Sequence, residues 1–224
     1  SSAASDVYKR QFMKYGFIGC GNMGGAVARA VCRGVGPENV VLANRTPAKA
    51  AVLAKELGGT VCPNAEAAET AELLFLGVKP QMIVDVLKGI APALKERKSA
   101  PVLISMVTGL DIARIQELAG GDYPVIRIMP NMPAAVGEGV IFYACSGNCD
   151  KAQQEAFLRY MAPAGKLFPL EEKLQDAGSA VAGCGPAFVC AGFERYELQW
   201  SCHSPFCFAQ KYCKFPALPT RIGR

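Results

Sequence analysis

Short apolar runs alternate with longer, alanine-rich stretches of helical spacing from residue 13 to about residue 168. Such alternation is typical of repeated β-α-β units, in which the strands form a parallel sheet with helices on both faces. The run at 101–107 is continuously apolar, as expected of a strand that is covered on both sides. The pattern therefore predicts an α/β fold built on a doubly wound sheet.

The same pattern gives approximate bounds for the elements. We expect strands at 15–20, 39–44, 60–63, 73–79, 101–107, 124–130, 139–145 and 165–168. We expect helices at 23–34, 47–57, 65–71, 81–95, 110–118 and 150–161.

The alternation also divides the chain into four segments. Residues 13–170 should form the α/β domain, and the helical pattern at 171–192 predicts the start of a second, all-helical domain that is truncated here. Residues 1–12 have no apolar periodicity. Residues 193–224 contain seven aromatic residues, one of which is the chain's single Trp, and also the single His. We interpret both end segments as tails outside the core, the second as the product of a shifted reading frame or as disordered chain.

Charge and apolar run length limit the partners that we expect. The net charge is +5, but it is concentrated in the two tails, which leaves the central 13–192 nearly neutral. Nucleic-acid binding needs clustered Lys and Arg, so we expect no nucleic-acid partner. No apolar run approaches the roughly 18 residues of a membrane span, so we expect no membrane association.

The ten cysteines are scattered and form no C-x-x-C pair. Cys20, Cys32 and Cys62 lie inside apolar patterns, where a thiol behaves as a small hydrophobic group. Reduced thiols and the lack of a signal peptide predict a cytoplasmic protein. A zinc site made of Cys202, His203, Cys207 and Cys213 is an alternative, but the spacing fits no common zinc site and we expect no metal.

A glycine-rich loop follows the first predicted strand and precedes the first predicted helix. Gly19 allows the tight turn, Gly21 lets a pyrophosphate approach the backbone, and Gly24 lets the helix pack on the strand. Cys20, Asn22 and Met23 complete the loop, and we expect the whole of 19–24 to bind the cofactor. This placement predicts a Rossmann-like fold that binds NAD(P); the alternative is a glycine turn without a ligand.

The end of the second predicted strand indicates which dinucleotide binds. Folds of this kind commonly place an acidic residue there to contact the ribose of NAD, but this chain has Asn44, Arg45 and Thr46. Arg45 can pair with the 2′-phosphate of NADPH, and Lys49 lies one turn further on. We therefore expect NADPH, with NADH possible; the alternative is that Arg45 is a solvated surface residue.

Three more predicted strand ends should lie at the same edge of the sheet, where ligands of open α/β sheets bind. Each could alone be an ordinary turn, but together they favour a cofactor cleft. The cofactor-binding residues expected there are Val78, Lys79 and Pro80, then Met106, Val107 and Thr108, then Pro130 and Asn131.

Taken together, these motifs closely resemble the pyrroline-5-carboxylate reductase family, in order and at its spacing, from residue 13 to about 189. The segments that carry the resemblance are 16–24 (GFIGCGNMG), 44–46 (NRT), 74–80 (LFLGVKP), 127–133 (RIMPNMP) and 176–188 (DAGSAVAGCGPAF).

The resemblance implies hydride transfer from NAD(P)H to the imine of 1-pyrroline-5-carboxylate, giving L-proline in the last step of proline biosynthesis. It places residues 19–24 at the pyrophosphate, 44–46 at the adenosine ribose and its phosphate, and Asn64 with 78–80 on the adenosine side. It places 106–108 and 130–131 beside the nicotinamide. Orientation should provide most of the rate, so no catalytic acid or base is named.

The resemblance ends near residue 190. The family continues into a helical domain that forms a homo-oligomer and grips the substrate carboxylate, and 193–224 do not match it. We therefore expect cofactor binding with poor turnover. The alternatives are another NADP-dependent imine or carbonyl reductase of the same superfamily, and a non-catalytic NADP-binding fragment.

Overall fold

A computed structural model of the chain describes residues 14–185 and 189. The chain divides into two units, Ser1–Ala182 and Gly183–Arg224, and the fold described here is that of the first. The predicted tails 1–12 and 193–224, with the cysteines and histidine considered for zinc, lie outside the described residues. So does part of the predicted helical segment 171–192.

The described residues of the first unit form one eight-stranded sheet with the order β3-β2-β1-β4-β5-β6-β7-β8. Neighbouring strands from β3 to β6 pair in parallel. The strands are β1 (Lys14–Ile18), β2 (Val40–Ala43), β3 (Thr60–Val61), β4 (Ala71–Leu76), β5 (Val102–Ser105), β6 (Val125–Met129), β7 (Gly139–Cys145) and β8 (Gly165–Pro169). All eight predicted strands are confirmed within three residues.

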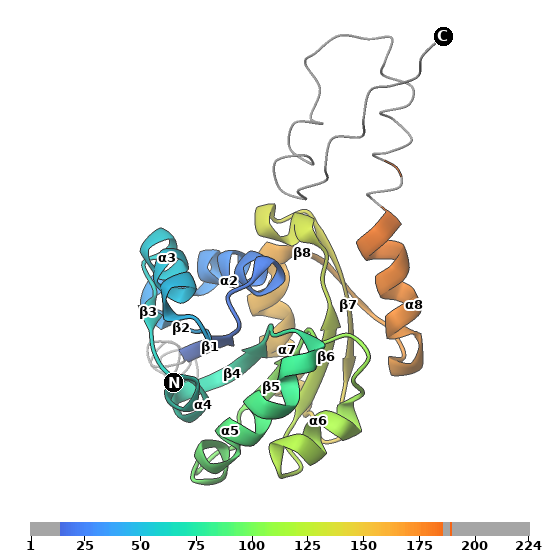
Figure 1. Cartoon of the computed structure of the whole chain (residues 1–224). Coiled ribbons are helices and arrows are strands. Elements are labelled where there is room, and N and C mark those ends of the chain that lie inside the picture. Colours follow the sequence, from blue (N-terminus) through green and yellow to red (C-terminus); the bar gives the residue numbers. More distant parts are fainter. Residues whose placement is uncertain (1–13, 186–188, 190–224) are drawn as a thin grey trace, which may run out of the picture. The chain divides into compact units, whose positions relative to one another are not determined.

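Helices connect the parallel strands (Figure 1), and all six predicted helices are confirmed within about two residues. The α-helices are α2 (Asn22–Val35), α3 (Pro47–Leu57), α4 (Asn64–Thr70), α5 (Ile83–Lys95), α6 (Ile112–Ala119), α7 (Lys151–Met161) and α8 (Gln175–Ser179). Short 3-10 helices are η1 (Pro37–Asn39), η2 (Pro80–Met82), η3 (Met132–Val136), η4 (Ala162–Ala164) and η5 (Glu172–Leu174); η6 (Ala180–Cys184) is a π-helix. No helix in these residues is both long and apolar enough to cross a membrane.

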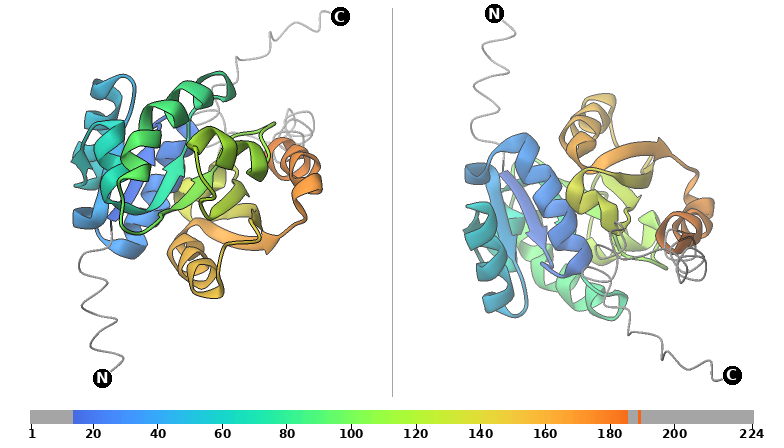
Figure 2. Two further views of the ribbon diagram at one scale, coloured as in Figure 1. Left: turned by 90° about the horizontal axis from the view of Figure 1, so that it is seen from below. Right: turned by 90° about the horizontal axis from the view of Figure 1, so that it is seen from above.

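The sheet separates two apolar cores. Successive side chains of β4 point to opposite faces of the sheet. Phe75 belongs to the core under α2, α3 and α7, whereas Leu74 and Leu76 belong to the core under α4, α5 and α6. Figure 2 shows α5 and α6 nearer the viewer in the left view and α2 in the right view. The predicted doubly wound α/β fold is therefore confirmed.

The expectation of a parallel sheet throughout is wrong at β7. This strand runs antiparallel to β6, with Ile126 opposite Cys145 and Met129 opposite Phe142. The connection, 130–138, holds only η3, whereas a parallel crossover needs about a dozen residues or more. The chain therefore turns back directly, and β8 then pairs in parallel with β7 after α7 crosses over.

The order of the strands reverses at β1. From β1 the chain moves through α2 to β2 on one side, and it later returns to β4 on the other side of β1. Ligands of open α/β sheets bind at the carboxyl ends of the strands where the order reverses in this way. The glycine loop after β1 lies at this point.

Beyond β8 the described chain is helical, as predicted from residue 171, through η5, α8 and η6. Gln175 is fully buried, and α8 packs on β6 and β7. The predicted domain boundary between 170 and 171 stays a prediction.

Candidate functional site

Two of the predicted loop glycines are required by the local structure itself. Gly19 has a φ of 103°, in the region that side chains rarely adopt. A Cβ on Gly24 would collide with the carbonyl oxygen of Gly19. These two glycines let α2 begin directly against the end of β1.

A third glycine in this contact, Gly77 after β4, was not among the predicted site residues. A Cβ on Gly77 would lie 2.9 Å from the carbonyl oxygen of Gly19, 3.0 Å from Cα of Gly24 and 3.1 Å from Cε of Met106. Its position directly after a buried strand was the available signal. Gly77 lets the ends of β1, β4 and β5 approach one another.

Gly21 differs from these glycines because nothing within the described protein requires it. Its φ is −75°, an ordinary value, and a Cβ there would have no atom within 4 Å. The backbone at Gly21 is exposed, so a close approach from outside is possible. A glycine in this setting fits a ligand that contacts the backbone, which is the role predicted for the pyrophosphate.

The start of α2 leaves hydrogen-bond donors for such a ligand. Gly21 occupies the N-cap position and has no side chain that could accept from the first turn, and that turn contains no acidic residue. The first N–H groups of a helix have no partner within the helix, and the helix dipole makes this end positive. Together they favour binding of an anionic phosphate.

Neighbouring strand ends hold the loop in place through main-chain hydrogen bonds. Gly19 N donates to the carbonyl oxygen of Ala43 at 2.8 Å, and Gly77 N donates to that of Ile18 at 2.8 Å. Cys20 N donates to Oδ1 of Asn44 at 3.0 Å. The loop is thus fixed to β1, β2 and β4 together.

The Cys20 side chain does not provide a nucleophile. Burial, with a smaller effect of nearby Cys62, raises the pKa of its thiol from 9.0 to about 11. Its Sγ contacts the carbonyl oxygen of Ala43 at 3.5 Å. At neutral pH the thiol is therefore protonated, and Cys20 fills space beside the loop.

The residues predicted to bind the adenosine phosphate divide into two kinds. Asn44 is engaged with the protein, because its Nδ2 also donates to the carbonyl oxygen of Thr46 at 3.0 Å. Arg45, Thr46 and Lys49 are exposed. Arg45 forms no ion pair within the described part of the chain, so its guanidinium is available to a ligand.

The other predicted adenosine-side residues also lie at this edge. Asn64 is the first residue of α4 and is half-buried, as is Val78. Lys79 and Pro80 are exposed, and Pro80 begins η2 at its first position, which suits its fixed φ.

On the predicted nicotinamide side, the residues differ in how far they can reach a ligand. Met106 and Pro130 are half-buried, and Thr108 is exposed. The side chain of Val107 is 1% exposed and packs in the core under α5 and α6, which leaves only its main chain at the edge. Val107 N donates to Oγ of Ser105 at 3.3 Å.

Asn131 is 5% exposed, and its amide makes two hydrogen bonds within the protein. Oδ1 accepts from Val140 N at 3.0 Å, and Nδ2 donates to the carbonyl oxygen of Ala182 at 3.1 Å. The amide thus connects the loop after β6 to β7 and η6. Its contact with a nicotinamide stays a prediction.

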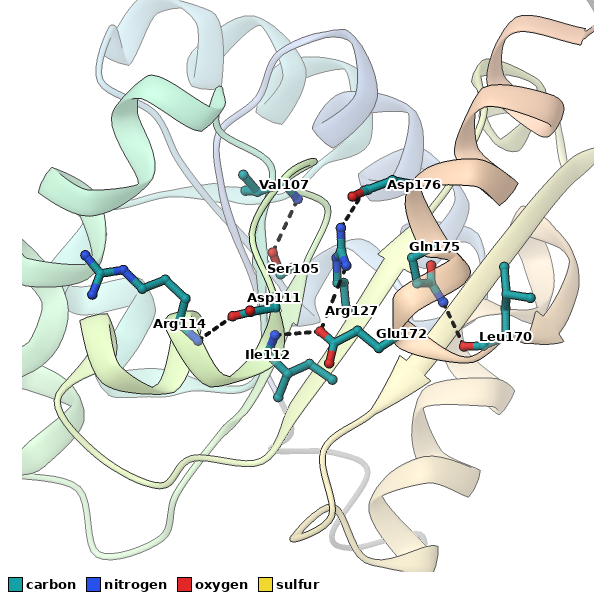
Figure 3. A network of polar contacts seen from close by, with 10 residues as sticks. All are labelled: Ser105, Val107, Asp111, Ile112, Arg114, Arg127, Leu170, Glu172, Gln175 and Asp176. Carbon is teal, nitrogen blue, oxygen red and sulfur yellow. Dashed lines mark hydrogen bonds and ion pairs between the residues drawn. The ribbon is translucent and has the colours of Figure 1, made fainter.

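A buried arginine close to this edge was not assigned a role from the sequence. Arg127 lies in β6 with its side chain 4% exposed, between two carboxylates (Figure 3). Its Nη2 lies 2.6 Å from Oδ1 of Asp176, and Nη1 lies 3.9 Å from Oε1 of Glu172. The same Glu172 oxygen accepts from Ile112 N at the start of α6, 2.6 Å away. The available signal was a charged residue inside an apolar strand.

The arrangement can bind and orient an anionic dinucleotide. The predicted site residues contain no carboxylate and no histidine, the side chains that most often act as general acids or bases. Their chemistry is that of donors, cations and apolar walls around a ligand. This fits a reaction in which alignment of the reactants provides most of the rate.

A family model described as "NADP oxidoreductase coenzyme F420-dependent" matches residues 14–109. The pyrroline-5-carboxylate reductase of Aquifex aeolicus is 31% identical over 199 residues, which cover 88% of this chain and 72% of that protein. Pyrroline-5-carboxylate reductase 3 of Danio rerio is 33% identical over 196 residues, covering 84% and 64%. The chain spans 64% and 65% of the length of the relatives from Corynebacterium melassecola and Glycine max.

Solved structures of pyrroline carboxylate reductases have a fold similar to that of this chain. The pyrroline carboxylate reductase of Plasmodium falciparum, whose structure has NADP bound, is 28% identical with a TM-score of 0.72, covering 82% of this chain and 67% of that one. The enzyme of Coxiella burnetii has a TM-score of 0.76 at 23% identity, covering 91% and 77%.

Proposed function

The chain belongs to the pyrroline-5-carboxylate reductase family, and we propose on this basis that it reduces the C=N bond of 1-pyrroline-5-carboxylate to form L-proline. The observation that carries the proposal is Gly21 at the start of α2, an exposed glycine that no contact within the described protein requires. The reaction is the last step of proline biosynthesis in the family that the sequence motifs resemble.

NADPH is the proposed cofactor, and the NADP bound by the Plasmodium falciparum relative supports this choice. The N–H groups at the start of α2 would hold its pyrophosphate, and Arg45 would pair with its 2′-phosphate. Asn44 would hold the loop through Cys20 N. When bound, NADPH supplies the hydride that the imine carbon accepts.

The chain's own residues bind and orient the reactants. Met106, Thr108 and Pro130 would form the wall beside the nicotinamide and exclude water from it. A protonated imine is already electrophilic, so the site needs to align the two reactants more than to move protons. No residue is proposed as a general acid.

The direct test is to follow NADPH absorbance with the purified full chain in the presence and absence of 1-pyrroline-5-carboxylate, with proline measured by chromatography. We expect imine-dependent NADPH oxidation and an equal amount of proline. The matched control is Gly21→Ala, which should keep the fold and lose most of this activity. NADPH consumption with a different cyclic imine only would contradict the proposed substrate, and NADPH binding without consumption would indicate a non-catalytic NADP-binding protein.

We also propose, from the family, that the chain forms a homo-oligomer in the cytoplasm. The measurement is the molar mass by light scattering of the full chain, with localisation by fractionation. A monomer would contradict the first part and a membrane or organelle fraction the second.

A further inference from the structure

Asn131 begins the loop that follows β6, but its side chain does not bond to that loop. The residue occupies the N-cap position of η3, and its main-chain carbonyl oxygen accepts from Ala134 N at 3.1 Å. An asparagine at this position usually accepts a hydrogen bond from the first turn through its side chain as well. Here the side chain makes no such bond. The amide of Asn131 is engaged with other parts of the fold instead.

One end of this amide extends the connection between β6 and β7. The antiparallel pairing of these strands reaches Met129, which lies opposite Phe142. Beyond this pair, Oδ1 of Asn131 accepts from Val140 N at 3.0 Å. The side chain therefore supplies an acceptor to β7 where the main chain has already turned into the loop. This bond supports the fold.

The other end of the amide holds a segment from much later in the chain. Nδ2 of Asn131 donates to the carbonyl oxygen of Ala182 at 3.1 Å. Ala182 lies in η6, the π-helix that continues α8, and it belongs to the first unit. Short π-helices are rare and are often found at functional sites. Earlier in the same segment, Asp176 pairs with Arg127 of β6 (Figure 3). Two side chains of β6 and its loop thus hold the helical segment.

The loop that carries Asn131 also carries part of the proposed nicotinamide wall. Pro130 directly precedes Asn131 and is half-buried. Asn131 itself is only 5% exposed, and both polar atoms of its amide are bonded within the protein. Its bonds therefore fix the place of η6 relative to Pro130. Because hydride transfer depends on the alignment of donor and acceptor, the place of a neighbouring wall affects the rate.

We propose, on the basis of the proposed reductase function, that Asn131 is a positioning residue for hydride transfer rather than a ligand of the nicotinamide. Its amide holds η6 at Ala182, and η6 forms the wall of the site on the side from which the imine approaches. The bond to Val140 supports the fold, whereas the bond to Ala182 aligns the reactants. The two bonds therefore have separable effects.

Asn131→Asp separates these two bonds. One carboxylate oxygen can still accept from Val140 N, but the other replaces Nδ2 and is repelled by the carbonyl oxygen of Ala182. The assay is run at about pH 8, where most carboxyl groups in proteins are ionised. Asn131→Ala loses both bonds, so it carries the same expectation for catalysis without introducing a charge.

Asn39→Asp is the matched control. Asn39 is 8% exposed, and its Nδ2 donates to the carbonyl oxygen of Val35 at 2.8 Å. It lies in η1, which precedes β2 and is therefore at the amino end of that strand. This variant replaces the same kind of buried donor at a place remote from the proposed site. It should leave the kinetics of imine reduction unchanged.

The measurements are steady-state reduction of 1-pyrroline-5-carboxylate by the full chain and calorimetric titration with two ligands. The ligands are NADPH and 2′-phospho-ADP-ribose, which lacks the nicotinamide. In both Asn131 variants we expect kcat to fall at least about tenfold, because a misplacement of about 1 Å can cost about 100-fold in rate. The affinities for both ligands should stay close to those of the wild type.

Three outcomes would overturn the proposal. The first is a wild-type kcat in folded Asn131→Asp or Asn131→Ala. The second is an equal loss of kcat in Asn39→Asp, which would indicate a general effect on the fold. The third is weaker binding of NADPH with unchanged binding of 2′-phospho-ADP-ribose, which would show that Asn131 contacts the nicotinamide.

Amide hydrogen exchange separates this proposal from the proposed function. Residues 180–182 should exchange faster in Asn131→Asp than in the wild type, whereas exchange in α7 should be the same in both. A wild type that binds NADPH but does not reduce the imine would contradict the proposed function. Unchanged exchange at 180–182 would contradict the role of Asn131, whether or not the chain reduces the imine.

Discussion

Arg45 is exposed two residues beyond the end of β2, where it can pair with a 2′-phosphate. A hydrogen bond to a charged group contributes about 1.5–3 kcal/mol, so we expect Arg45→Ala to weaken NADPH binding by roughly 10- to 100-fold. NADH lacks this phosphate, and its affinity should change little. Fluorescence titration of the wild type and of Arg45→Ala with both dinucleotides measures the ratio of NADPH affinity to NADH affinity.

Lys49 supplies the control for this prediction. It is exposed on α3, one turn further from the end of β2, so Lys49→Ala should lower the NADPH affinity much less than Arg45→Ala does. An unchanged ratio of the two dinucleotide affinities in Arg45→Ala would show that Arg45 does not select NADPH.

Single residues of the site were predictable where the spacing of a motif determines their position. Gly19, Gly21 and Gly24 lie where the glycine pattern indicated. The engagement of the Asn44 and Asn131 amides by the protein's own main chain could not be predicted, since their partners come from other strands and loops. The sequence shows which side chains could bind a ligand, but it does not show which of them already form hydrogen bonds within the protein.

At the scale of elements, an ion pair joins α8 to β6. Removing one partner of a buried ion pair costs about 3–5 kcal/mol, because the remaining charge is left without compensation. Asp176 is itself 62% exposed, so water screens the pair and we expect less than this range, about 2 kcal/mol, for Asp176→Ala. Urea unfolding measures the change.

A double-mutant cycle completes this test. With Arg127→Met the buried charge is gone, so adding Asp176→Ala should cost under about 1 kcal/mol. The exposed pair of Lys151 and Glu155 is the matched control, and Glu155→Ala should change the free energy of unfolding by less than about 0.5 kcal/mol. Strictly additive effects of the two substitutions would contradict coupling between α8 and β6.

Most helices and strands could be predicted from the hydrophobic pattern, because apolar residues are spaced differently in a buried strand and in an amphipathic helix. The direction of β7 could not be predicted from this pattern, because the apolar spacing is the same in parallel and antiparallel strands. The direction depends on the length of the connection between β6 and β7. The missing helix between residues 130 and 138 was a visible signal. The partners of Arg127 were not visible, because Glu172 and Asp176 lie more than 40 residues further along the chain.

At the scale of the whole molecule, the raised pKa values of Cys20 and Cys62 predict a loss of stability at alkaline pH. Both thiols have a pKa of about 11 in the folded protein, against an ordinary value of 9.0. Between these values the unfolded chain has released protons that the folded protein still holds. Their contribution is therefore complete below about pH 9 and is lost as the pH rises towards about 11.

Urea unfolding of the wild type and of Cys62→Ala across this pH range measures the effect. The variant should lose less free energy of unfolding with rising pH, because one shifted thiol is gone and the shift of Cys20 is reduced. All other groups are the same in the two proteins and cancel in the comparison. Parallel pH profiles would contradict the prediction.

The central claim is that the edge of the sheet at the glycine loop binds NADPH through the backbone of Gly21. Calorimetric titration of NADPH into the wild type and Gly21→Ala tests it most directly, since the added Cβ meets no protein atom within 4 Å and should change stability by no more than about 1 kcal/mol. We expect the variant to melt near the wild-type temperature and to bind NADPH at least about tenfold more weakly, a loss of about 1.4 kcal/mol. Equal NADPH affinity in the two folded proteins would contradict the claim.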